Sequence, residues 1–237
     1  MKTFLVNLDK EQTRLVHMIA QLARLGIDFE RIPAVYGKDL SPEDLKMSFS
    51  VFRSFCAMGR KLTLGEIGCS LSHLAIYRKM IKAEIPYALI FEDDIVIDAS
   101  ITEKLIEIEK MVTPNKAQVI LFSALGFKGG DENGIFQNNE AMCTDGYVIT
   151  LSAAKKIYHA NYPVVTTADA WPRWIKRLGL EVYCCWPPIV QQDNDTFGTD
   201  INTANRKAAA GLWKWLRKMR RVLEVFIDWL WFKITKH

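Results

Sequence analysis

The first 37 residues constrain the fold more than any other part of the chain, because their apolar pattern changes period twice. Residues 2–8 (KTFLVNL) form a short apolar run of the kind found in buried strands. Apolar residues then recur at helical spacing over residues 11–26, where Gly26 supplies a stop signal. Residues 28–37 have the pattern of a second strand that ends in a glycine turn. A strand, a helix and a returning strand predict a βαβ unit, and therefore a parallel sheet with a right-handed crossover.

The rest of the chain continues this alternation, which predicts the α/β class. Helices are predicted over residues 62–86, 100–112, 152–158 and near 170, and strands over 88–98, 117–125, 146–151 and near 182. Ser100 is the predicted cap of its helix, and Glu103 completes a capping box. Residues 38–62 are irregular by pattern, apart from a helix start with Ser41 as the cap. Residues 126–134 are predicted to form a loop.

Size and composition fit one fairly large domain, or one domain with an appendage. Of the 237 residues, 49% are hydrophobic and 24% charged, which is enough for a sizeable core. The sequence contains no run of about 18 uncharged apolar residues, so no membrane span is predicted. The first apolar run is too short for a secretory signal. The five cysteines form no CxxC pair and have no zinc-type spacing, which favours a reduced, cytoplasmic compartment.

Three consecutive carboxylates, Glu92, Asp93 and Asp94, interrupt the apolar stretch ALIFEDDIVID at residues 88–98. A bound Mg²⁺ or Mn²⁺ at the carboxyl end of a parallel strand would compensate their charge. On a strand, alternation sends Glu92 and Asp94 to one side and Asp93 to the other. The alternative is that the strand ends near Phe91 and the acids begin a solvated loop. This segment alone favours neither interpretation.

Further motifs accompany the acids in a fixed order along the chain. They are VNLD (6–9) with Arg14, IPAVYG (32–37), LTLGEIGCSLSH (62–73), FEDD (91–94), DGYVITLSAAKKI (145–157), TTADAW (166–171) and PPIVQQ (187–192). Taken together they resemble glycosyltransferase family 25, the lipopolysaccharide and lipooligosaccharide biosynthesis transferases. The resemblance spans roughly residues 3–195.

The resemblance implies a GT-A-like fold, with a mixed, mainly parallel sheet flanked by helices. It also implies inverting transfer of a hexose from a nucleotide donor, commonly UDP-galactose, to a saccharide of bacterial lipooligosaccharide or lipopolysaccharide, with Mn²⁺ or Mg²⁺. The implied metal ligands are Asp94 and Glu92. The implied donor-binding residues are Asn7, Leu8, Arg14, Gly65, Ser72, His73, Glu92 and Asp93. One departure is that Leu15 follows Arg14, where many members have adjacent arginines.

Asp169 matches a later acidic position of the family, and we assign it the role of general base toward the acceptor hydroxyl. Its alternative role is to cap the short helix that follows. Trp171 has a ring suited to stacking on a sugar. The further acceptor-binding candidates are Tyr147 and Gln191, with Asp145 and Glu140 as reserve candidates for the base. Cys69, on the helix of His73, is interpreted as a packing residue.

The last 33 residues differ in charge from the rest of the chain. Residues 205–237 hold nine basic and two acidic residues, a net charge of +7, whereas the remaining 22 basic and 25 acidic residues give −3. Apolar positions and tryptophans alternate with basic residues at helical spacing. We therefore predict a catalytic domain over residues 1–204 and a basic amphipathic tail over 205–237 that contacts an anionic membrane surface. The alternative is a helix that docks on the domain itself or on a second subunit.

These predictions place the protein in the cytoplasm, peripheral on the inner face of the bacterial inner membrane, with no nucleic-acid partner. Two other functions remain open at this point. One is a Mg²⁺-dependent phosphohydrolase or nuclease that uses the same three acids. The other is a non-catalytic membrane-bound adaptor with the same fold.

Overall fold

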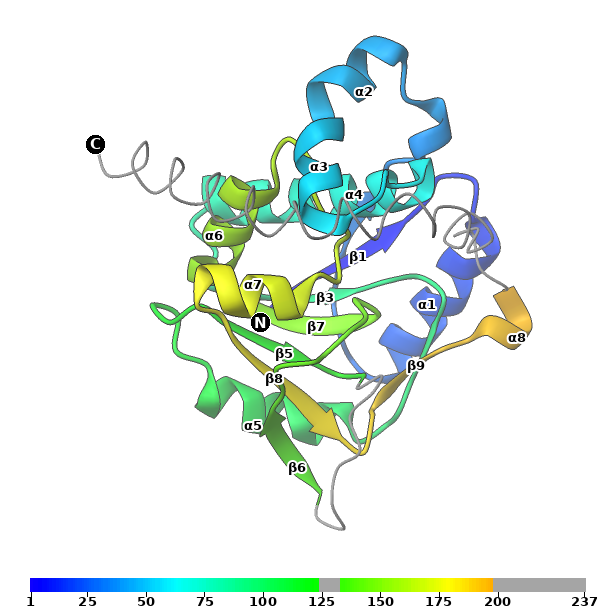
Figure 1. The fold of residues 1–237 in the computed structure, drawn as a ribbon. Coiled ribbons are helices and arrows are strands. Elements are labelled where there is room, and N and C mark those ends of the chain that lie inside the picture. The colour runs from blue at the N-terminus through cyan, green and yellow to red at the C-terminus, as the bar shows by residue number, and fades with distance from the viewer. Residues whose placement is uncertain (124–132, 198–237) are drawn as a thin grey trace.

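The computed structural model describes residues 1–123 and 133–197 (Figure 1). Its strands are β1 (Lys2–Asn7), β2 (Glu30–Pro33), β3 (Tyr87–Phe91), β4 (Ile95–Ile97), β5 (Gln118–Leu121), β6 (Gly134–Gln137), β7 (Gly146–Thr150), β8 (Glu181–Trp186) and β9 (Val190–Gln192). Its helices are α1 (Gln12–Arg24), the 3₁₀ turn η1 (Gly37–Asp39), α2 (Pro42–Ser48), α3 (Val51–Met58), α4 (Leu64–Lys82), α5 (Ile101–Met111), α6 (Leu151–Asn161), α7 (Trp171–Leu178) and α8 (Asn194–Phe197).

The central sheet has seven strands in the order β2-β1-β3-β7-β5-β8-β6. β1 pairs in parallel with β2 and with β3, and β5 pairs in parallel with β8. β7 lies antiparallel between β3 and β5, and β6 is antiparallel to β8 at the edge. Five of these strands therefore run in one direction and two in the other. This confirms the predicted α/β class with a mixed, mainly parallel sheet.

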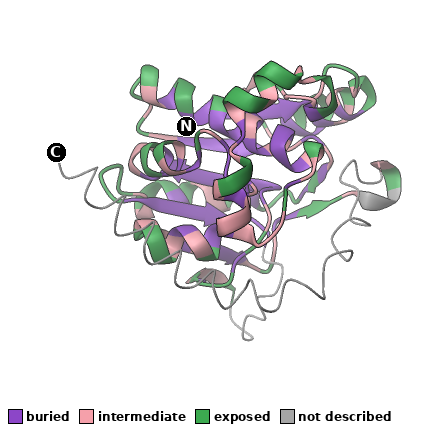
Figure 2. Cartoon of the chain, turned by 45° about the horizontal axis from the view of Figure 1, so that its top comes forward, coloured by how far each residue is buried: buried purple, intermediate pink, exposed green. Residues whose placement is uncertain are grey.

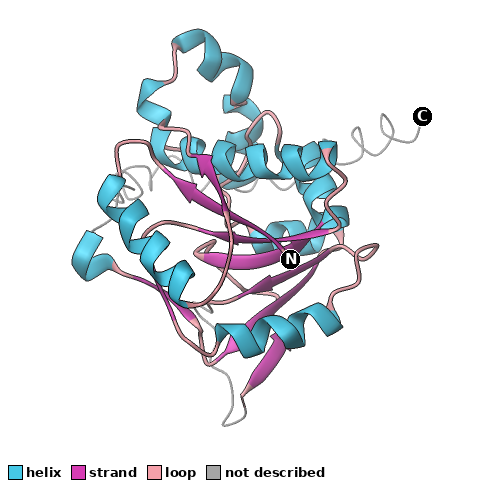
Figure 3. Cartoon of the chain, turned by 180° about the vertical axis from the view of Figure 1, so that it is seen from behind, coloured by secondary structure: helices cyan, strands magenta, loops and turns pink. Residues whose placement is uncertain are grey.

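Helices cover both faces of this sheet, as the view from behind shows (Figure 3). Consecutive strand residues point to opposite faces, so Phe4 packs in one apolar cluster and Leu5 in the other. The first cluster holds side chains of α4, α6 and α7, and the second holds side chains of α1 and α5. The central strands β1, β3, β5 and β7 are buried along nearly their whole length (Figure 2), which explains why they appear in the sequence as continuous apolar runs.

The local predictions met different outcomes. The opening βαβ unit is confirmed by the parallel register of β1 and β2. Ser41 is confirmed as the cap of α2, because its hydroxyl accepts the backbone N–H of Asp44. The capping box at Ser100 is wrong: Ser100 has helical dihedral angles, and its side chain makes no capping hydrogen bond. The side chain of Asp98 instead accepts the backbone N–H of Ser100.

A close backbone contact fixes the amino-terminal half of α4 against residues 35–37. A Cβ atom on Gly37 would lie 1.8 Å from the carbonyl oxygen of Leu64, and one on Gly68 would lie 2.4 Å from that of Val35. The hydroxyl of Ser72 accepts the N–H of Val35 and donates to the carbonyl of Gly68. Gly37 of IPAVYG and Gly68 of GEIGCS are therefore needed, because only a glycine permits this approach.

Within residues 1–123 and 133–197, no helix is both long enough and apolar enough to cross a membrane. The predicted amphipathic tail, residues 205–237, lies outside the described residues, as does most of the predicted loop at 126–134.

Candidate active site

The three acids lie at the edge of the sheet where β1, β3 and β5 end. Asn7 is the last residue of β1, and Glu92 follows the last residue of β3 directly. Because β7 runs in the opposite direction, it begins at this same edge, with Asp145 just before its first residue. The backbone N–H of Glu92 donates to the carbonyl of Asp145 over 2.9 Å. Polar groups from three strands thus converge where α/β sheets commonly bind ligands.

The strand ends at Phe91, so strand alternation does not decide where the three carboxylates point. Glu92 faces His73, and Asp93 faces Asn7, whose side-chain amide donates to Asp93 Oδ2 over 2.6 Å. The predicted grouping of Glu92 and Asp94 against Asp93 therefore rests on a wrong premise. The loop is not solvated either, since Asp93 is only 8% exposed.

Two arginines hold the amino-terminal side of the cluster. Arg31 Nε donates to Asn7 Oδ1 over 2.8 Å, which turns the amide nitrogen of Asn7 toward Asp93. Arg14, on the first turn of α1, places Nη1 3.5 Å from Asp93 Oδ1 and 3.9 Å from Asp94 Oδ2. Its side chain is 8% exposed, so a phosphate that reached it would meet a largely desolvated guanidinium.

Negative charge in the cluster exceeds what these contacts compensate. Burial and the charges of Glu92 and Asp93 raise the pKa of Asp94 to about 7. Burial and the charge of Glu92 raise the pKa of Asp145 to about 7. Among the described residues, Asp94 Oδ1 is buried and has no hydrogen-bond partner. A buried carboxylate oxygen without a donor is costly unless a cation binds it.

Glu92 is the exception, because its pKa is lowered although it lies in the same cluster. Burial alone would raise its pKa, but the hydrogen bonds from His73 and Thr144 lower it. His73 Nε2 lies 3.1 Å from Glu92 Oε1, and the hydroxyl of Thr144 donates to the same oxygen. The other ring nitrogen of His73 lies 2.7 Å from the hydroxyl of Tyr147, which in turn lies 2.7 Å from that of Tyr77. A chain of hydrogen bonds thus leads from the site into the core.

Asp169 does not cap α7. The cap position is Ala170, and no side chain caps the helix; Asp169 contributes only its carbonyl, which accepts the backbone N–H of Trp171. Its half-buried carboxylate lies close enough to the cluster that its charge helps to raise the pKa of Asp145. Within the described part of the chain, no hydrogen bond reaches this carboxylate.

The other predicted site residues occupy varied positions. Trp171 is fully buried and donates its ring N–H to the carbonyl of Cys143, so no ring face is open to a sugar. Tyr147 is also fully buried. Gln191 is exposed on strand β9, opposite Val96. Leu8 directly follows β1, and Gly65 and Ser72 lie on α4, where the Ser72 hydroxyl bonds to the backbone of Val35 and Gly68.

Several residues of the site were absent from the sequence prediction. Arg31, Thr144 and Cys143 contact it only because strands far apart in sequence end together. Cys143 has a φ of 81°, a conformation that is rare for a residue with a side chain, and its carbonyl receives the Trp171 ring N–H. Asp145 was a reserve candidate only, although DGY opens one of the family motifs. No sequence signal distinguishes Arg31 or Thr144 from ordinary surface residues.

Carboxylates at the carboxyl edge of a mixed α/β sheet, beside a buried arginine, are typical of proteins that bind a phosphorylated ligand together with a divalent cation. The comparison with known families is more specific. The chain belongs to glycosyltransferase family 25, because the family described as "Glycosyltransferase family 25 (LPS biosynthesis protein)" matches residues 1–171.

Two relatives show the range of this similarity. A "Glycosyltransferase 25 family member" of Drosophila melanogaster is 31% identical over 171 residues, covering 68% of this chain and 28% of the relative. "Procollagen galactosyltransferase 2" of Homo sapiens is 28% identical over 174 residues, covering 67% of this chain and 27% of the relative. The chain therefore spans little more than a quarter of the length of these relatives.

Among solved structures, a glycosyltransferase "involved in the glycosylation of the major capsid of PBCV-1" has 10% sequence identity and a TM-score of 0.35. The match covers 68% of this chain and 65% of that chain.

Proposed function

We propose that this protein is a glycosyltransferase that transfers a hexose to a saccharide hydroxyl with inversion at the anomeric carbon. The proposed hexose is galactose, and the proposed donor is UDP-galactose. Membership of family 25 supports the transferase class, and the galactosyltransferase name of the human relative supports the sugar. The observation that carries the proposal is the buried, undercompensated acidic cluster at the carboxyl edge of the sheet. Such a cluster suits a cation that is bound together with a diphosphate.

The residues fit the Mn²⁺ or Mg²⁺ that the family implies. Asp94 offers a buried oxygen without a partner, and Glu92, two residues earlier, is near enough for its charge to act on Asp94 and is the second carboxylate ligand. Carboxylate oxygens are the ligands that these hard ions prefer. When bound, the ion would neutralise the charge that develops on the departing diphosphate. Asp94 and Glu92 are therefore the proposed metal ligands.

The protein's own groups have separate tasks in this proposal. Arg14 and the Asn7–Asp93 pair bind and orient the nucleotide diphosphate at the end of β1. Asp169 accepts the proton of the acceptor hydroxyl, while the new bond to the anomeric carbon forms and the bond to UDP breaks. Its role is supported by a carboxylate that caps no helix and that lies within electrostatic reach of the cluster.

The acceptor in this proposal is a saccharide of bacterial lipooligosaccharide or lipopolysaccharide. The description of the family as an LPS biosynthesis protein supports it. The basic tail, residues 205–237, would hold the enzyme on the anionic cytoplasmic face of the inner membrane, where such a glycolipid is extended.

The experiment measures UDP-galactose binding by calorimetry and UDP release with and without a saccharide acceptor, each with and without Mn²⁺. Asp94→Ala should lose Mn²⁺-dependent donor binding. Asp169→Asn should bind the donor normally and lose transfer by about 10²–10⁴-fold, the usual contribution of a general base. Asp98→Asn is the matched control, because this exposed acid lies four residues from Asp94 and caps only Ser100.

Two results would replace the proposal. Equal phosphate-ester hydrolysis with and without acceptor would identify a phosphohydrolase. Failure of the unaltered protein to bind either Mn²⁺ or a nucleotide sugar would identify a non-catalytic adaptor. Mn²⁺-dependent donor binding that survives in Asp94→Ala would remove the metal assignment alone.

A further inference from the structure

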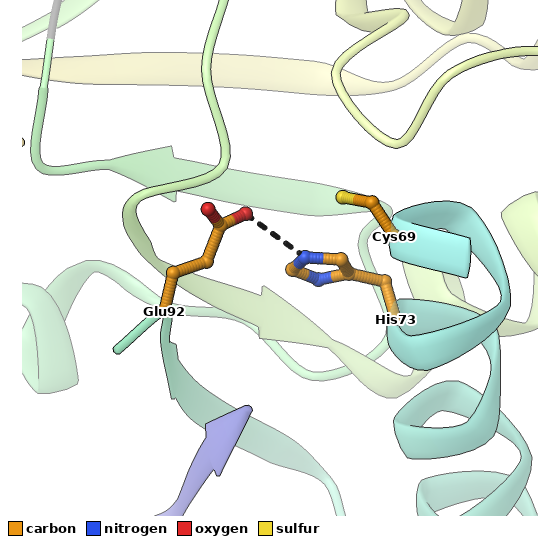
Figure 4. Close-up of side chains that lie close together, drawn as sticks. All are labelled: Cys69, His73 and Glu92. Carbon is orange, nitrogen blue, oxygen red and sulfur yellow. Dashed lines mark hydrogen bonds and ion pairs between the residues drawn. The ribbon is translucent and has the colours of Figure 1, made fainter. Parts of the chain in front are cut away.

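A thiol, an imidazole and a carboxylate meet beside the acidic cluster. Cys69 and His73 are four residues apart on α4 and therefore lie on one face of the helix. Both side chains lie on the side of the helix that faces Glu92, as Figure 4 shows. One potential ligand atom from each of the three residues lies within 4.8 Å of the other two. Neither the proposed transfer nor the packing of the core uses Cys69.

We propose that Cys69, His73 and Glu92 form a second metal site, for a transition-metal ion of the Zn²⁺ type. Thiolate, imidazole and carboxylate are the three ligand types that zinc takes in proteins. A thiolate is a poor ligand for Mg²⁺ and Mn²⁺, which favour oxygen, so this trio selects a different ion from the one proposed at Asp94. Glu92 belongs to both proposed sites: its Oε1 faces His73, which leaves Oε2 for the ion at Asp94. Three protein ligands leave one tetrahedral position for a water molecule or a substrate oxygen.

The spacing of the trio fits coordination after a small side-chain movement. Metal–ligand bonds of about 2 Å place neighbouring nitrogen and oxygen ligands of a tetrahedral ion roughly 3.3 Å apart. The 3.1 Å between His73 Nε2 and Glu92 Oε1 is close to that value. Cys69 is the ligand that has to approach, and rotation about its single side-chain torsion moves the sulfur without moving the helix.

The surroundings of His73 provide the support that a ligating histidine needs. Its Nδ1 lies 2.7 Å from the Tyr147 hydroxyl, so the ring is held by the nitrogen that faces away from Glu92. Without metal, the Tyr147 hydroxyl donates to Nδ1, and Nε2–H donates to Glu92. With metal on Nε2, Nδ1–H donates to the Tyr147 oxygen, and the Tyr147 hydroxyl then donates to the Tyr77 oxygen. Either hydroxyl can be the donor in this 2.7 Å hydrogen bond, so both arrangements of His73 are possible.

The local field attracts a cation and opposes a free thiolate. The charges of Glu92, Asp169, Asp94 and Glu66 all act on the sulfur of the half-buried Cys69. Of these four acids, Glu66 is neutralised by Arg60, at 2.6 Å. A divalent ion bound to the sulfur replaces the thiol proton, which is released to solvent, and brings two positive charges into the remaining negative field. The same field makes Cys69 unsuited to act as a nucleophile.

The test uses the full chain, stripped of metal with a chelator and titrated with Co²⁺ as a spectroscopic substitute for Zn²⁺. Thiolate ligation of Co²⁺ gives a sulfur-to-metal charge-transfer band in the near ultraviolet. We expect this band at one equivalent of Co²⁺, and its loss on addition of one equivalent of Zn²⁺. Cys69→Ser should abolish the band and weaken Zn²⁺ binding by more than about 100-fold, since loss of an outer partner alone costs 10–100-fold. Cys56→Ser on α3 is the matched control and should leave both unchanged.

Two more variants separate this site from the proposed Mn²⁺ site. Asp94→Ala should keep the charge-transfer band, and Cys69→Ser should keep Mn²⁺-dependent donor binding. Tyr147→Phe should keep the band and weaken Zn²⁺ binding by about 10–100-fold, because it removes the partner of Nδ1.

The absence of a charge-transfer band from the unaltered protein would overturn the proposal, as would a band that persists in Cys69→Ser. If Cys69→Ser does not fold, X-ray absorption of the Zn²⁺-loaded unaltered protein decides. One sulfur ligand at about 2.3 Å is expected, and a coordination shell of nitrogen and oxygen alone would overturn the proposal. None of these outcomes depends on sugar transfer, so the two proposals fail separately.

Discussion

Glu66 and Asp94 are both largely buried acids near the same site, yet their surroundings act in opposite directions. Burial raises the pKa of each, but Glu66 receives two hydrogen bonds from Arg60, at 2.8 and 2.6 Å, and one from the backbone N–H of Thr63. The net effect lowers the pKa of Glu66. Among the described residues, the one basic partner of Asp94 is Arg14 at 3.9 Å, which is too distant to offset burial and two neighbouring carboxylates. Glu66 is thus held in a structural ion pair with Arg60, whereas Asp94 is left to bind a cation.

The Arg60–Glu66 pair predicts a pH-dependent loss of stability in Arg60→Met. A folded pKa below the unfolded value of 4.5 gives stability that is present above pH 4.5 and is lost as the pH falls through the folded pKa. At pH 7 the variant leaves a buried carboxylate without its partner, and we expect a cost of about 2 kcal/mol, since Arg60 is partly exposed. Near pH 3.5 the difference from the unaltered protein should shrink. Urea unfolding at both pH values measures it.

The neighbouring Lys61→Met is the control, because Lys61 is exposed and should change stability by less than about 0.5 kcal/mol. An equal loss at both pH values in Arg60→Met would show that Arg60 acts through packing and not through the charge of Glu66.

At the scale of elements, long stretches with a regular apolar period were predicted from the sequence, whereas several short elements were not. The βαβ opening and the helices α1, α4 and α5 follow from periodicity, because each buries a face against the sheet. α3, β6 and β9 were missed, since each is eight residues or shorter and the two strands form only by pairing with distant partners. Tertiary pairing decides such segments, and it leaves no periodic signal in the sequence.

The site divides in the same way. The acids at 92–94 were recognised as a candidate because three consecutive charges interrupt an apolar run. Their orientation was not predictable, because it depends on Asn7, His73 and Thr144, which three other segments bring to the same edge. The Cys69–His73 pair is visible on one helix face, but only the fold adds Glu92 as a third group.

The contact between α4 and residues 35–37 predicts that Gly68→Ala is costly. The added Cβ would lie 2.4 Å from the carbonyl oxygen of Val35 and 2.8 Å from the backbone nitrogen of Gly37, so backbone must move. We expect a loss of about 3 kcal/mol in the free energy of unfolding, at the upper end for overpacking. Calorimetric melting measures it. Because His73 lies on the next turns of the same helix, its hydrogen bond to Glu92 should weaken as well.

Gly179→Ala provides the comparison, since Gly179 has a φ of 63° but nothing within 4 Å of its Cβ position. It should cost about 1–2 kcal/mol, from the left-handed conformation alone. A Gly68→Ala variant that is as stable as the unaltered protein would mean that α4 shifts freely, and the close approach would then have no energetic role.

At the scale of the whole molecule, charge is divided between a slightly acidic body and a strongly basic tail. Residues 205–237 carry +7 and the other residues −3. An anionic surface would attract the tail and repel the body, which favours an orientation with the tail toward the surface. The competing arrangement, a tail docked on the acidic body, would neutralise much of this asymmetry. The two differ in whether the tail's charges remain available to lipid.

A variant that removes four positive charges from the tail decides between these arrangements. The variant changes four basic residues to glutamine: Lys214, Arg217, Lys218 and Arg221. Each basic residue near an anionic surface contributes about 1 kcal/mol to binding. The four changes should therefore weaken the affinity for phosphatidylglycerol vesicles, measured by co-sedimentation, by nearly a thousandfold. Mn²⁺-dependent donor binding should be unchanged.

The matched control makes the same substitution at four exposed lysines of the body: Lys61, Lys82, Lys116 and Lys155. It removes equal charge and should leave vesicle binding intact. Equal sedimentation of the tail variant and the unaltered protein would instead favour a tail that packs on protein.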